Sequence, residues 1–224
     1  MKHDRKKITD ACSVLIVTSV EAEKEAILKG LKSDHRFQVE TIGVGPVAAA
    51  ARTAWLLGDN SYKAVINMGV AGGITSNIQI GDAVIASEII AGDLGAESPE
   101  GFKPLEELGF GLSRLKCDNQ IVSPLKEEIN NKADITVHNG AVLTLSTVTG
   151  SAETLERLKM RFPEASAEAM EGFGAATAAD LHDVPFYEIR TISNAAGPRN
   201  KNAWRLKDAL TSLTIVSECL KEVF

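Results

Sequence analysis

Residues 13–31 read SVLIVTSVEAEKEAILKGL and contain the unit on which the chain is built. Ser13–Thr18 has the length and the Val/Ile content of a buried strand, and Glu21–Leu31 follows with helical spacing. The same order recurs along the chain. Further strands are expected at Val39–Ile42, Ala64–Met68, Asp82–Ile90, Ala141–Leu145 and Phe186–Ile192, and further helices at Pro46–Leu57, Ser151–Arg161, Gly172–Leu181 and Ala203–Val223. This alternation predicts an α/β fold with a mixed central sheet flanked by helices.

The length and composition favour a single domain. The 224 residues are 44 % hydrophobic, which is enough for one buried core, and no Pro/Ser-rich linker divides them. We expect one domain over 1–224, with residues 1–12 as a flexible head. The irregular stretch Gly92–Asn119 is expected to form a long excursion near the functional site.

Charge and cysteine content exclude several classes of function. A formal net charge of −6 without clustered Lys and Arg argues against nucleic acid as a partner. Three cysteines and four histidines are scattered, which suggests neither a disulfide framework nor a metal site. No signal-like or membrane-spanning apolar run is found, so a cytoplasmic protein without a membrane partner is expected.

Three polar or glycine-rich segments follow predicted strands, where open α/β sheets usually bind ligands. They are Thr18–Glu23, Asn67–Gly73, and a C-terminal block made of Glu168–Gly172, Pro185–Asn194, Gly197–Arg199 and Trp204. Each also has a purely structural reading, because acids complement a helix N-terminus and Ser or Asn commonly cap one. The glycines match neither a dinucleotide fingerprint nor a Walker motif, which disfavours nucleotide phosphates and nicotinamide cofactors.

The order of three motifs is distinctive. VAGG at 70–73, AMEG at 169–172 and ISN at 192–194, preceded by PFYEIR, resemble motifs of the purine nucleoside phosphorylase and methylthioadenosine nucleosidase superfamily. The resemblance implies a single α/β domain that forms homo-oligomers. It also implies action on a small purine nucleoside with no metal or organic cofactor.

The resemblance also implies roles for individual residues. Glu171 matches a glutamate that accepts hydrogen bonds from the ribose hydroxyls, with Met170 packing on the sugar, and a carboxylate there would steady an oxocarbenium-like transition state. Glu23 matches the glutamate that activates water in the nucleosidases. Asn194 matches the residue that reads the purine. Four further residues are expected near the purine, namely Ser193, Arg190, Val70 and Val148.

Water is favoured over phosphate as the attacking group. Phosphorylases of this superfamily hold phosphate with glycine and arginine near the first turn, whereas this chain has Glu21 and Glu23 there. Carboxylates repel a phosphate dianion, and close like charges cost on the order of 1 kcal/mol even under solvent-like screening. The chain is therefore expected to be an N-glycosyl hydrolase with Glu23 as general base.

Asn194 favours a 6-oxopurine. An asparagine amide presents two donors, which suit the N7 and O6 acceptors of hypoxanthine, whereas aspartic acid suits adenine. An amide cannot give up a proton, so the donor to the departing base is unidentified.

The run ISNAAGPRNKNAWRLKDAL at 192–210 is similar to futalosine hydrolases, and through them implies menaquinone biosynthesis. Futalosine carries a benzoate at its 5′ end, which Arg199, Lys201 or Arg205 can pair with while Trp204 covers the ring. The choice among the three cations stays open. The alternatives are a methylthioadenosine/S-adenosylhomocysteine nucleosidase, a purine nucleoside phosphorylase and a non-catalytic nucleoside-binding module.

Overall fold

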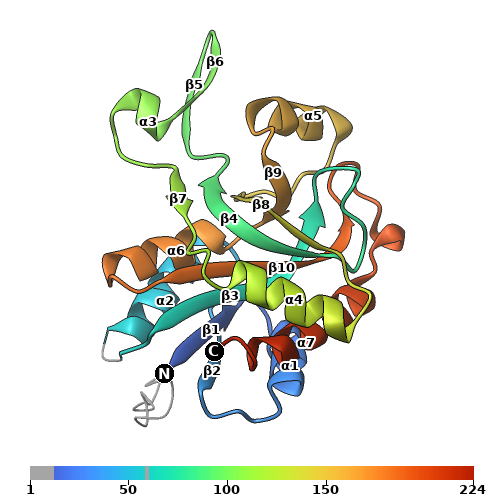
Figure 1. Cartoon of the computed structure of the whole chain (residues 1–224). Helices are drawn as coiled ribbons and strands as arrows, with labels where there is room; N and C mark the ends of the chain where they lie inside the picture. The colour runs from blue at the N-terminus through green and yellow to red at the C-terminus, as the bar shows by residue number, and fades with distance from the viewer. Residues whose placement is uncertain (1–12, 59–60) are drawn as a thin grey trace.

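The computed structural model describes residues 13–58 and 61–224 (Figure 1). The expected head, residues 1–12, lies outside the described residues. The strands are β1 Val14–Thr18, β2 Phe37–Thr41, β3 Ala64–Gly73, β4 Ala83–Ala91, β5 Gly95–Ser98, β6 Gly101–Pro104, β7 Arg114–Lys116, β8 Val137–Thr144, β9 Ala165–Ala169 and β10 Phe186–Ala195. The helices are α1 Glu21–Leu31, α2 Pro46–Leu57, α3 Leu105–Leu108, α4 Val122–Lys132, α5 Ala152–Arg161, α6 Gly172–Leu181, the 3₁₀ turn η1 Lys201–Ala203 and α7 Leu206–Leu220.

The central sheet is mixed, as expected, and part of it closes on itself. Strand β3 pairs with β10, β10 with β4, β4 with β8, β8 with β9, and β9 again with β3. β1 and β2 extend this ring from β3 as a parallel wing. The β10–β4 and β3–β9 pairs are antiparallel, while the β1–β3, β3–β10 and β4–β8 pairs are parallel.

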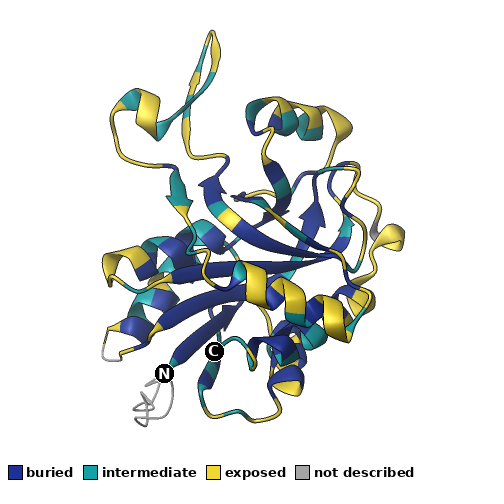
Figure 2. Ribbon diagram, viewed as in Figure 1, coloured by how far each residue is buried: buried dark blue, intermediate teal, exposed yellow. Residues whose placement is uncertain are grey.

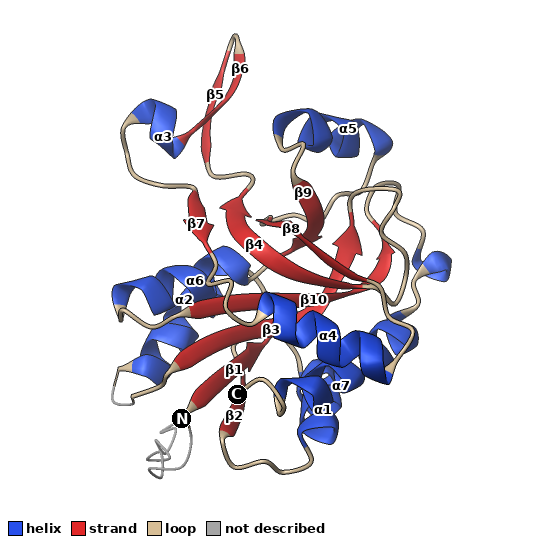
Figure 3. Cartoon of the chain, viewed as in Figure 1, coloured by secondary structure: helices blue, strands red, loops and turns tan. Residues whose placement is uncertain are grey.

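Helices cover both faces of the wing (Figure 3). α1, α4 and α7 pack with alternate residues of β1 such as Val14 and Ile16, whereas α2 and α6 pack with Leu15 and Val17. Successive residues of a strand point to opposite faces of the sheet. Helices cover both faces here, so the residues on both faces of β1 are apolar. Figure 2 shows the central strands as largely buried and the β5–β6 hairpin as largely exposed.

The predicted helix boundaries have local causes. α1, α2 and α6 span the expected residues, and α5 follows Ser151, whose hydroxyl accepts from Thr154 N at 3.1 Å. Pro46 opens α2, where its missing N–H costs nothing. Among the described residues, no helix is both long enough and apolar enough to cross a membrane.

One expectation about the fold is wrong. Gly92–Asn119 forms the β5–β6 hairpin, α3 and β7, and none of its residues lines the pocket described below. The hairpin projects from the body of the molecule (Figure 1). Its irregular composition does not show that part of it forms a two-stranded ribbon, or which way such a ribbon points.

Candidate active site

The site lies where one edge of β3 changes partner. β1 pairs with β3 as far as Asn67, and β9 pairs with it only from Gly72 onward. Between these partners the backbone N–H of Val70 donates to Glu23 Oε1 at 2.8 Å. The Glu23 side chain, from the start of α1, thus satisfies a backbone N–H of β3 that neither β1 nor β9 reaches. The gap between β1 and β9 forms the floor of a pocket.

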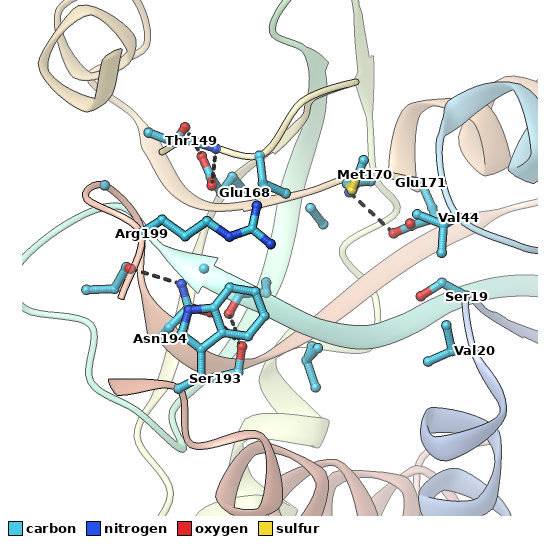
Figure 4. Close-up of a pocket in the computed structure, with 18 of the residues that line it drawn as sticks. Ser19, Val20, Val44, Thr149, Glu168, Met170, Glu171, Ser193, Asn194 and Arg199 are labelled. Carbon is cyan, nitrogen blue, oxygen red and sulfur yellow. Dashed lines mark hydrogen bonds between the residues drawn. The ribbon is translucent and has the colours of Figure 1, made fainter. Parts of the chain in front are cut away.

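This pocket has a volume of about 310 Å³ and opens beside α1, β9 and the end of β10 (Figure 4). It brings together residues that are far apart in the sequence. Those expected from the sequence that line it are Glu23, Val70, Val148, Met170, Glu171, Ser193, Asn194, Arg199 and Trp204. Their roles stay predictions.

Glu23 is held by an unusually complete set of donors. Its Oε2 accepts from Thr18 Oγ1 at 2.8 Å, Ser19 Oγ at 2.6 Å, and the backbone N–H groups of Ser19 and Val20 at 3.1 and 3.2 Å. The side chain is 2 % exposed. These hydrogen bonds fix the position of the Glu23 carboxyl group at the pocket.

Glu171 is the second carboxylate at this end. It is the N-cap residue of α6, and its Oε1 accepts from Gly45 N at 3.3 Å, at the start of α2. Two helix N-termini therefore converge on one carboxylate, where their dipoles favour negative charge. Met170, whose N–H lies 3.3 Å from Glu171 Oε2, lines the adjoining wall.

The structure places Arg190 differently from the expectation. Its side chain does not line the pocket; Nε donates to Glu188 Oε1 at 2.7 Å, and Nη2 lies 3.6 Å from Glu171 Oε2. In the β3–β10 register, Arg190 lies opposite Gly69, three positions before the partner of Asn194. Three strand positions correspond to about 10 Å, so the guanidinium reaches the buried carboxylates of Glu188 and Glu171 and not Asn194.

Gly69 lies where these groups crowd together. A Cβ at this position would lie 2.6 Å from Glu23 Oε1 and 2.9 Å from Arg190 Nη1. Both distances are shorter than a carbon tolerates from a nitrogen or an oxygen. A side chain at this position would displace the end of Glu23 or of Arg190, whereas glycine leaves both in place on the same side of β3.

The amide of Asn194 has a defined orientation. Its Oδ1 accepts from Ser193 Oγ at 2.8 Å, and its Nδ2 donates to the Ala195 carbonyl at 2.9 Å. From the residue type alone, two donors for the base are expected. One of them is bound to the backbone here, which leaves a single Nδ2 hydrogen for a ligand.

The mouth of the pocket carries one of the three candidate cations. Arg199 lines it, with its guanidinium 6.0 Å from the ring centre of Trp204. Arg205 instead donates to the Asn202 carbonyl at 3.1 Å and does not line the pocket. The side chain of Lys201 lies outside what the structure describes.

Glu168, for which the sequence predicts no role, lies in the pocket wall. Its Oε1 accepts from Thr149 N at 3.0 Å, and its Oε2 accepts from the Thr149 hydroxyl. Burial raises the pKa of this carboxyl. One feature of the sequence could have indicated Glu168, because it is the one acid within the small-residue run Ala165–Ala169. This run was not predicted as a strand, so the direction of the Glu168 side chain could not be inferred.

No cluster of three His, Cys, Asp or Glu suited to a metal ion is found within residues 13–58 and 61–224. The described part of the pocket is built from carboxylates, hydroxyl groups, one amide, one guanidinium, one indole and apolar side chains. Such a set can bind ribose hydroxyls, a polar base and an anionic substituent.

Comparison with known proteins agrees with this geometry. The chain is 38 % identical to the futalosine hydrolase of Streptomyces coelicolor over 221 residues, covering 90 % of this chain and 92 % of that one. In structure it is similar to a 5′-methylthioadenosine/S-adenosylhomocysteine nucleosidase from Neisseria meningitidis, with a TM-score of 0.81, 24 % identity, and 94 % and 99 % of the two chains covered. Futalosine hydrolase of Helicobacter pylori gives a TM-score of 0.79 at 21 % identity, covering 95 % and 98 %. Residues 9–224 match the phosphorylase superfamily, and the chain belongs to that family.

Proposed function

We propose that this protein is a nucleosidase that hydrolyses the N-glycosidic bond of futalosine and releases hypoxanthine. The observation that carries the proposal is a single pocket with two anchored carboxylates, Glu23 and Glu171, at one end and the Asn194 amide at the other. The similarity to the futalosine hydrolase of Streptomyces coelicolor along most of both chains supports the choice of substrate.

The carboxylate end suits attack by water. Glu171 accepts from the ribose hydroxyls, and Glu23 takes a proton from water as the water oxygen bonds to C1′ and the C1′–N9 bond breaks. The electron pair of that bond leaves with the base, which takes up one proton to become neutral hypoxanthine. Positive charge that develops on the sugar is stabilised by the two carboxylates, which also repel a phosphate dianion.

The other two parts of the pocket suit the two ends of futalosine. The free Nδ2 hydrogen of Asn194 donates to N7 or O6 of the departing hypoxanthine, and its Oδ1 is kept away from these acceptors by Ser193. At the mouth, Arg199 pairs with the benzoate carboxylate and Trp204 covers its ring.

The same proposal includes the cellular context. We place the protein in the cytoplasm as a homo-oligomer that needs no cofactor, in menaquinone biosynthesis. The family resemblance supports this context.

The test is release of hypoxanthine from futalosine by the purified protein in phosphate-free buffer, with methylthioadenosine and inosine measured in parallel. Selective release from futalosine is expected. Release of adenine from methylthioadenosine alone would contradict the choice of base, and activity that requires added phosphate would contradict the hydrolytic step. Arg199→Ala should raise KM for futalosine more than KM for inosine, because inosine has no carboxylate at its 5′ end.

A further inference from the structure

Glu168 and Asn194 face each other across one glycine. In the register of the sheet, Glu168 of β9 lies opposite Gly72 of β3, and Gly72 lies opposite Asn194 of β10. A Cβ on Gly72 would lie 3.4 Å from both Asn194 Nδ2 and Glu168 Cγ. The absence of a side chain at Gly72 leaves the space between the carboxyl and the amide open.

Glu168 is a buried carboxyl without a counter-ion. It is 5 % exposed, and among residues 13–58 and 61–224 it forms no ion pair. Thr149 supplies both of its hydrogen bonds, one to each oxygen. A carboxylate oxygen accepts more than one hydrogen bond, so both oxygens retain acceptor capacity beside the pocket. The hydrolytic chemistry at Glu23 and Glu171 makes no use of this group.

The two groups match opposite parts of one base edge. Along that edge, a 6-oxopurine presents the N1–H donor, the O6 acceptor and the N7 acceptor in this order. A carboxylate can take the N1–H, an amide N–H can take N7 or O6, and a glycine between them leaves room for O6. In a 6-aminopurine N1 is itself an acceptor, so it would face the carboxylate without a proton to share.

We infer that Glu168 accepts the N1–H of the base and, together with Asn194, determines that the substrate is a 6-oxopurine nucleoside. This inference rests on the proposed function, since it assigns a further residue to the same site. Glu168 adds a hydrogen-bond acceptor for the base, whereas Asn194 contributes only a donor. Leaving a buried acceptor opposite another acceptor penalises the wrong base more strongly than a lost contact in an apolar pocket does.

The first test uses the unmodified protein and free bases. The dissociation constants of hypoxanthine, 1-methylhypoxanthine and adenine are measured by titration calorimetry. Removal of the N1 proton by methylation should weaken binding by roughly tenfold to a hundredfold, as expected for a hydrogen bond to a charged group. Adenine should bind more weakly than hypoxanthine by a similar factor.

The second test compares Glu168→Gln with Glu156→Gln, a matched change on α5 where the carboxylate is 64 % exposed. In Glu168→Gln the preference for hypoxanthine over adenine should shrink about tenfold or more, because the amide offers a donor and no charge. In Glu156→Gln all three constants should stay unchanged. Equal binding of hypoxanthine and its 1-methyl derivative by the unmodified protein would overturn the inference even if Glu168→Gln does not fold.

Turnover of futalosine separates this inference from the proposed function. If futalosine is hydrolysed but the base preference of Glu168→Gln equals that of the unmodified protein, the role of Glu168 is wrong and the function stands. If futalosine is not hydrolysed but the N1 proton still contributes the expected factor through Glu168, the function is wrong and the base-reading role stands.

Discussion

Replacement of Glu23 by glutamine tests the centre of the proposed mechanism, and the structure sets the size of both its effects. Glutamine keeps one oxygen, which must stay where Oε2 accepts from the side chain of Thr18 and the backbone of Ser19 and Val20. The new amide nitrogen then replaces Oε1 and faces the N–H of Val70, which lies 2.8 Å from that oxygen. Two donors oppose each other in a buried place.

One buried donor is then left without a partner, which should lower the free energy of unfolding by about 1–3 kcal/mol. For a chain of this length the melting temperature should fall by about 2–12 °C. Turnover should fall by roughly 100-fold or more, since the amide cannot take a proton from water. Ribose contacts through Glu171 are untouched, so KM should change much less than kcat.

Base release is measured well below the lowered melting temperature, so that every molecule counted is folded. Glu25→Gln is the control. Glu25 lies two residues away on the same helix and is exposed, and its substitution makes the same chemical change. It should leave the melting temperature and kcat unchanged. A kcat for Glu23→Gln within about tenfold of the unmodified enzyme would refute the assignment of Glu23 as the base.

Asn194→Asp should shift the kcat/KM preference toward 6-aminopurine nucleosides, and an unchanged preference for hypoxanthine would contradict the role given to this amide. Gly69→Ala should lower kcat by on the order of 100-fold, because the added methyl group displaces the Glu23 carboxylate, whose Oε1 would lie 2.6 Å from it; calorimetric binding of hypoxanthine should be retained. Burial raises the pKa of Glu168, so the preference for hypoxanthine over adenine should be lost as pH falls through a value above that of an ordinary glutamate. The same raised pKa makes ionisation of Glu168 destabilising, so its contribution to the free energy of unfolding falls as pH rises through that value, and urea titrations of Glu168→Gln should show a smaller decline.

Much of the fold is local and could be predicted. The strand–helix order, the bounds of α1, α2 and α6, and the cap at Ser151 follow from periodicity and from residues adjacent in sequence. β9 and α4 were missed. β9 is a run of small residues without Val or Ile, and α4 contains Pro124 and a largely polar sequence, so neither resembles a typical strand or helix.

Within the site, the sequence could indicate which residues lie in one pocket but not the direction in which their side chains point. Motif order indicated Glu23, Glu171 and Asn194, and the structure places all three in one pocket. It predicted Arg190 near Asn194, whereas the structure pairs this arginine with Glu188, close to Glu171. The direction of a side chain on β10 depends on its register with β3, including the irregularity between Ile192 and Asn194, and register is a non-local property.

The sequence by itself determined the α/β class, the family and the residue types available for chemistry, because these depend on local periodicity and on motif order. Only the tertiary structure decided that the edge of β3 changes partner at the pocket, that Gly72 separates Glu168 from Asn194, and that Arg199 lines the mouth while Arg205 turns to the backbone. Each of these outcomes depends on strands from distant parts of the chain meeting in one register. Pairing between distant strands is set by the packing of the whole sheet and not by any one segment.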